Sequence, residues 1–129
     1  MAEQTKERAG EDARRKARCE TIVHASSVAA GAAASVALIP GSDAVAIMPI
    51  QVAMVAAVAR EYGIEPSASL LKSVVYASLG SIVGKAGAGF LLRWTPIAGN
   101  TVRAAVAFGV TEALGKLVLD RLEAGEGLG

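Results

Sequence analysis

The sequence contains few aromatic residues, one cysteine, one histidine and little net charge, and each shortage excludes a class of protein. Aromatic residues make up 4% of the 129 residues, so a buried core must consist of Ala, Val, Leu and Ile. The single cysteine, Cys19, excludes an internal disulfide and fits a reducing compartment. A formal net charge of +1 creates no field that would attract nucleic acid, so we predict no nucleic-acid partner.

The reactive side chains form no catalytic or metal-binding pattern. Cys19 and His24 are five residues apart, whereas a pair on one helical face needs a spacing of about three or four. No ligand set recurs at the spacings of a metal site. The glycine-rich segment from Gly84 to Gly89 lacks the Gly-Lys-Ser or Gly-Lys-Thr ending of a phosphate-binding loop, and no strand precedes it. We therefore predict a protein that is not an enzyme and that holds no cofactor and no metal.

Alanine-rich segments without alternation of polar and apolar residues predict an all-α protein. The expected architecture is four long helices forming two antiparallel helical hairpins that pack through small residues. The helices are predicted over residues 11–38, 43–62, 67–93 and 100–122. The predicted organisation is a charged N-terminal arm (1–19, helical or disordered), a four-helix hairpin domain (20–122) and a flexible tail (123–129).

The predicted helix ends rest on proline and glycine. Pro40 and Gly41 end the first helix, after which Ser42 or Asp43 caps the second. Pro49 then either kinks the second helix or begins it, and the apolar residues before it favour the kink.

Gly63 is a suitable residue just beyond the end of the second helix. The second half of the chain then repeats the plan of the first half. Pro96 and Gly99 form the break before the last helix, and Asn100 or Thr101 can cap it.

Residues 21–59 carry Asp43 as their one formal charge, and this predicts contact with a membrane. A bilayer span needs about twenty mostly apolar residues, so 21–42 is a marginal span and 21–59 a spanning or re-entrant hairpin. Basic residues on both sides of this hairpin predict the cytoplasmic side, and the group before it predicts binding of anionic lipid. These basic residues are Arg14, Arg15, Lys16, Arg18 and Arg60.

The second hairpin is less suited to a bilayer, because Lys85, Arg103 and Glu112 lie inside its helices. A soluble, self-assembling four-helix scaffold is therefore the alternative hypothesis, and it predicts a homo-oligomer, since alanine buries little area per residue.

Glycines in the third predicted helix indicate close packing against another helix. Gly80 and Gly84 lie one turn apart, and each glycine in a helix costs up to about 1 kcal/mol relative to alanine. A close approach of two helix backbones would offset this loss.

A set of residues spread over roughly 20–120 resembles the GTPase-associated domain-of-unknown-function family 697, which includes YcjF-like inner-membrane proteins. The matching residues are Pro40, Gly41, Asp43, Gln51, Met54, Arg60, Tyr62, Gly63, Pro96, Gly99, Thr111 and Gly115. The resemblance implies association with membrane lipid and with a GTPase, but no chemistry by this domain. Because no GTPase motif occurs in the sequence, the GTPase would be on another chain. Asp43 is expected to cap a helix, Gln51 to form an interhelical hydrogen bond, and Tyr62 with Gly63 to end a helix.

The leading hypothesis is thus a non-catalytic, membrane-associated helical module on the cytoplasmic side that serves a partner, such as a GTPase on another chain.

Overall fold

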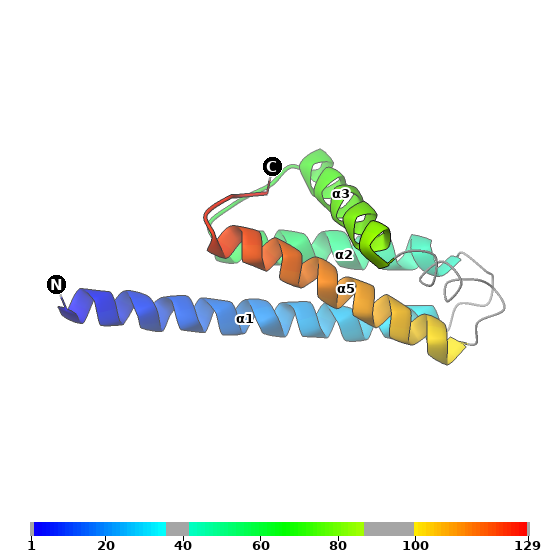
Figure 1. Cartoon of the computed structure of the whole chain (residues 1–129), viewed down its shortest axis with the longest axis horizontal. Helices are drawn as coiled ribbons and strands as arrows, with labels where there is room; N and C mark the ends of the chain where they lie inside the picture. The colour runs from blue at the N-terminus through cyan, green and yellow to red at the C-terminus, as the bar shows by residue number, and fades with distance from the viewer. Residues whose placement is uncertain (1, 36–41, 87–99, 129) are drawn as a thin grey trace.

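The computed structural model describes residues 2–35, 42–86 and 100–128, and within these ranges the chain is helical and contains no strand (Figure 1). The all-α prediction is confirmed. The helices are α1 (Ala2–Ser35), α2 (Ser42–Glu61), α3 (Ala68–Ala86) and α5 (Asn100–Glu123).

The first helix begins earlier than predicted. The charged arm is continuous with the rest of α1, because the sequence from Ala2 onward contains no proline and its lone Gly10 is tolerated in a helix. Glu3 in the first turn complements the helix dipole, and Asp12 bonds Arg15 one turn later at 2.7 Å.

The second helix begins at Ser42 and contains Pro49, so the alternative in which Pro49 starts the helix is wrong. Its predicted end at Gly63 is confirmed. Gly63 has a φ of 74° and donates to the carbonyl of Arg60, while Ile64 donates to the carbonyl of Ala59, both at 3.0 Å. These two bonds form a Schellman motif, which needs the positive φ that glycine adopts without strain.

The same motif ends α5, where Gly125 has a φ of 78° and Glu126 donates to the carbonyl of Arg121. The turn directs the end of the chain back over the bundle, so that Leu128 is buried in the core. Residues 123–129 were predicted to form a flexible tail; instead, Leu128 packs against the helices.

The long helices α1, α2 and α5 lie side by side, and α1 is antiparallel to both of the others (Figure 1). Arg18 of α1 pairs with Glu61 near the end of α2, and Ser27 of α1 bonds Glu112 of α5. The most extensive interface is that of α1 with α5, whereas α3 crosses the bundle and packs more sparingly on α2 and α5. The grouping into two separate hairpins therefore stays a prediction.

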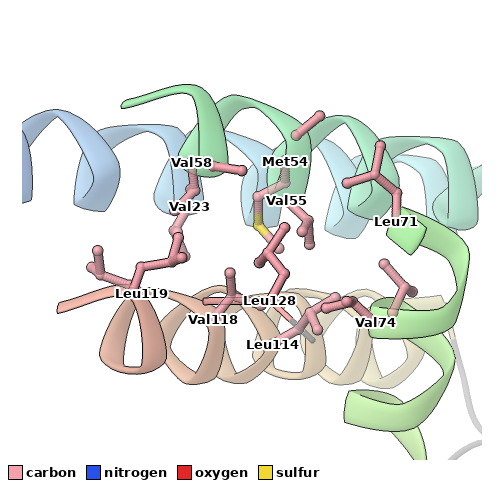
Figure 2. Close-up of a cluster of buried hydrophobic side chains, with 14 of the residues drawn as sticks. Val23, Met54, Val55, Val58, Leu71, Val74, Leu114, Val118, Leu119 and Leu128 are labelled. Atoms are coloured by element: carbon pink, nitrogen blue, oxygen red, sulfur yellow. The ribbon is translucent and has the colours of Figure 1, made fainter. Parts of the chain in front are cut away.

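The main core lies where these helices meet (Figure 2). It is aliphatic, as the shortage of aromatic residues predicts. Each helix contributes a stripe of apolar side chains, and Leu128 completes the cluster. The labelled members are Val23, Met54, Val55, Val58, Leu71, Val74, Leu114, Val118, Leu119 and Leu128.

Close packing through glycine occurs between α1 and α5, not on α3. A Cβ atom on Gly31 would lie 3.2 Å from the carbonyl oxygen of Ala104, and one on Gly115 would overlap Val23. By contrast, Gly80 and Gly84 are exposed, and added Cβ atoms there would meet no atom of the described chain within 4 Å. Within the described residues, the prediction of close packing at Gly80 and Gly84 is therefore wrong.

Candidate functional site

Two adjacent residues of α5 form polar contacts with two different helices. Gln51 of α2 donates to Thr111 at 3.2 Å, and both side chains are buried. The interhelical hydrogen bond predicted for Gln51 is therefore confirmed. Ser27 of α1 lies 2.7 Å from a carboxylate oxygen of Glu112 and 2.8 Å from the carbonyl oxygen of Val23. Neighbouring positions on a helix point in different directions, so Thr111 and Glu112 fix α5 against α2 and α1 respectively.

Paired charges connect α1 to the C-terminal ends of α2 and α5. Arg18 contacts Glu61 at 2.9 Å, and Lys16 lies 3.9 Å from Glu123. The guanidinium of Arg15 is positioned over the Tyr62 ring, 4.3 Å from its centroid. We call these residues, together with Asp12, the charged collar, and it connects α1 to the C-terminal ends of α2 and α5.

The charged collar alters the prediction for the basic cluster. Three of the four basic residues before the hairpin, namely Arg15, Lys16 and Arg18, have an acidic partner in the same chain, since Arg15 also pairs with Asp12. The carboxylates beside these three residues weaken the attraction to anionic lipid that is expected of the cluster. Sequence spacing did not reveal these pairs, because two of the three acidic partners lie on other helices.

Cys19 is fully buried beside the charged collar. Burial raises the pKa of its thiol, and the carboxylate of Glu61 raises it further. Burial also raises the pKa of the Tyr62 hydroxyl, and Glu123 adds to the effect. Both groups are thus kept neutral at physiological pH, and Cys19 behaves as a core residue, not as a nucleophile.

The fold collects the uncharged segments of three helices at the opposite end. We define the uncharged end as residues 21–35 of α1, 46–59 of α2 and 102–113 of α5. Because α1 is antiparallel to α2 and α5, these segments lie together. Their formal charges are those of Arg103, whose residue is 8% exposed, and of Glu112, which contacts Ser27.

The exposed surface of the uncharged end is small and weakly apolar. On α1 it includes Ala25 and Ala29, with Val28 at 52% exposure, and on α5 it includes Val102 at 42%. His24 is exposed on the same segment of α1, with its ring edge-on to Phe108 at 5.6 Å between centroids. In α1 the charged residues (3–20) are therefore separated from the uncharged ones (21–35), and the fold extends this separation to the bundle by placing the uncharged segments of α2 and α5 beside residues 21–35.

The structure brings together some of the predicted residues and leaves others apart. Gln51 meets Thr111, Tyr62 meets Arg15, and Gly115 meets Val23. Asp43 lies in the first turn of α2. Pro40, Gly41, Pro96 and Gly99 lie outside the described residues.

Two interactions were not predicted, namely the contact of Ser27 with Glu112 and that of Arg15 with Tyr62. Nothing in the local sequence marks either one, because their members are 85 and 47 positions apart.

Neither a bilayer-crossing helix nor a metal-binding group is present in the part of the chain that the structure describes. None of its helices is both long and apolar enough to cross a membrane. Within the same residues, no His, Cys, Asp and Glu side chains cluster in groups of three or more that could hold a metal ion.

The fold and the candidate site thus define a class, that of all-α proteins with a polarised helical bundle. Comparison with protein-family models, with curated proteins and with solved structures found no match. The resemblance to the GTPase-associated family stays a prediction.

Proposed function

We propose that this protein is a non-catalytic helical module that associates with the cytoplasmic side of a membrane through its uncharged end. The separation of charge along the bundle is the observation that carries the proposal. Removing a charged side chain from water is costly, so a surface that contacts a bilayer should carry few exposed charges. The uncharged end meets this requirement, and the charged collar marks where contact with water begins.

The length of the uncharged end supports shallow insertion. The segment from Thr21 to Ser35 would span about 22 Å at the rise of an α-helix. The hydrocarbon core of a bilayer is about 30 Å thick, so this segment would reach into the membrane without crossing it. Shallow insertion is also compatible with the described helices, none of which is long and apolar enough to cross a membrane. The module would therefore bind one face of a membrane, as amphipathic interfacial elements do.

The lipid class follows from the charged collar. Since Arg15, Lys16 and Arg18 are paired with carboxylates of the same chain, they offer little net charge to anionic headgroups. Binding would depend mainly on the uncharged end, so vesicles of zwitterionic lipid, which have no net charge, should bind the protein. Weak dependence on salt is expected for the same reason.

Vesicle flotation of the purified full chain tests the proposal. Phosphatidylcholine vesicles should carry wild-type protein to the top of a gradient. Ala25→Glu combined with Val28→Glu should reduce the bound fraction at least about tenfold, because two exposed positions of the uncharged end become charged.

The matched control is Ala13→Glu, at an exposed position of α1 outside the uncharged end. It should bind like wild type, and melting curves of all variants should overlap. If wild-type protein stays at the bottom with both zwitterionic and anionic vesicles, the proposal is wrong.

A soluble, self-assembling helical scaffold is the second candidate. It is favoured by the small size of the exposed side chains, because Ala25, Ala29 and Ala32 would allow a helix of another copy to approach closely. Sedimentation without lipid separates the two candidates. If wild-type protein is an oligomer and the Ala25→Glu and Val28→Glu changes dissociate it, the uncharged end is the surface through which the copies assemble.

A GTPase on another chain is the proposed partner, and only the family resemblance supports it. Co-purification from cells of the same source, with nucleotide analysis of the captured material, tests this part separately. Retention of a GTP-binding protein by wild-type bait is the expected result, and its absence would limit the proposal to membrane association.

A further inference from the structure

The N-terminal part of α1 extends past the other helices of the bundle (Figure 1). Residues 2–14 are exposed apart from Gly10, which is half-buried, and we call them the protruding arm. Polar helices of this length are marginally stable in water unless they pack against something.

One face of α1 carries charges in a self-complementary order. Glu3, Glu7, Glu11, Arg14 and Arg18 fall within an arc of about 80° at 100° per residue, and all five residues are exposed. The acidic residues come first along this face and the basic residues follow. We call this the bipolar face of α1.

The bipolar face has a centre between Gly10 and Glu11. Glu7 and Arg14 lie equally far from this point on either side, and so do Glu3 and Arg18. A second copy of the chain, rotated by a two-fold axis through the centre, would place each acidic residue opposite its basic counterpart.

We propose that two copies of this protein associate by antiparallel pairing of their bipolar faces. Glu3 of each copy pairs with Arg18 of the other, and Glu7 pairs with Arg14. This inference goes beyond membrane association and does not depend on it.

The structure leaves these groups able to pair. The side chain of Arg18 is 55% exposed although it contacts Glu61, and a guanidinium has donors for more than one carboxylate. Gly10 lies near the centre of the face along the helix, and the side chain of Arg14 reaches back over it, with Nη1 3.5 Å from the position of an added Cβ atom. Glu11 opposes the association, since its two copies lie near the axis and repel each other. Exposed ion pairs are individually weak, so the dimer is weak and sensitive to salt.

Disulfide cross-linking of the full chain tests the orientation. In a Gly10→Cys variant the two introduced thiols would be close to the two-fold axis, so oxidation should produce a covalent dimer. In the matched Lys6→Cys variant the thiols would be about 13 Å apart along the helix axis, beyond the reach of a disulfide. The natural Cys19 is fully buried and remains in both variants. Equal cross-linking of both variants, or cross-linking of neither, would overturn the proposal.

Sedimentation at low salt, without lipid, tests the charges. Glu3→Arg with Glu7→Arg makes the face wholly basic, and Arg14→Glu with Arg18→Glu makes it wholly acidic. Each variant alone should raise the dissociation constant about tenfold or more, and an equimolar mixture should restore a dimer.

Glu11→Gln should instead tighten association, which a nonspecific attraction between charged helices would not produce. Circular dichroism confirms folding, and Arg14→Glu alone serves if loss of the Arg18–Glu61 pair disturbs it. Unchanged association in the charge variants would also overturn the proposal.

Discussion

The side chain of Val23 on α1 occupies the space into which a Cβ atom on Gly115 of α5 would project. The two helices approach so closely here because Gly115 has no side chain. Gly31 allows a second close approach, to the backbone of Ala104. Small residues thus determine the spacing of the most extensive helix interface in the described chain.

Gly115→Ala should destabilise the protein by about 1–3 kcal/mol, because the added methyl group must displace Val23 or separate the helices. Urea unfolding followed by circular dichroism measures the change. Gly80→Ala is the matched control, since Gly80 is an exposed helical glycine with open space around it. That variant should be more stable than wild type by up to about 1 kcal/mol. A destabilised Gly80→Ala variant would show that another molecule packs against α3.

The hydrogen bond between Gln51 and Thr111 should appear as coupling in a double-mutant cycle. Gln51→Leu or Thr111→Val alone should cost about 1–3 kcal/mol, because each leaves a buried polar partner unsatisfied. The double variant should cost less than the sum of the two single changes. Free energies of unfolding of all four proteins give the coupling, and strict additivity would contradict the contact.

Stability should fall at alkaline pH. The pKa of Cys19 is raised in the folded protein, mainly by burial, so the unfolded chain loses this proton first, near its ordinary value of about 8.5. Above that pH the unfolded state binds fewer protons than the folded state, and the free energy of unfolding decreases as pH rises. The contribution is fully present below about pH 8.5.

Replacement of the thiol tests this dependence. Cys19→Ala should flatten the fall in the free energy of unfolding above about pH 8.5, whatever its effect at neutral pH. Tyr62→Phe should act only at higher pH, since the pKa of Tyr62 is also raised from its ordinary value of about 10. An unchanged slope in Cys19→Ala would mean that the thiol ionises equally in both states.

Vesicle clustering should follow if both proposals hold. Antiparallel pairing of the bipolar faces would direct the uncharged ends of two copies away from each other. One dimer could then bind two vesicles, and wild-type protein should raise the turbidity of a phosphatidylcholine suspension at low salt. Glu3→Arg with Glu7→Arg should bind vesicles without clustering them. Equal clustering by this variant would contradict the combination.

The local sequence determined the helices. Alanine-rich segments predicted an all-α chain, and Gly63 marked the end of α2. These features depend on residues close together in the chain. No local signal marks the beginning of α1, which starts at Ala2 and not at the predicted residue 11.

Only the tertiary structure decided which helices pair, which glycines lie at an interface, and where the charges gather. Gly115 and Gly80 look alike in the sequence, but Val23 packs on one while the other is open. The basic cluster is close to Glu61 and Glu123 only in the folded chain, because these carboxylates lie at the ends of α2 and α5. The physical reason is that α1 and α5 are far apart in sequence and contact each other through small side chains of similar size. Many helix pairings therefore suit the local sequence pattern, and only the packing of the whole bundle selects one of them.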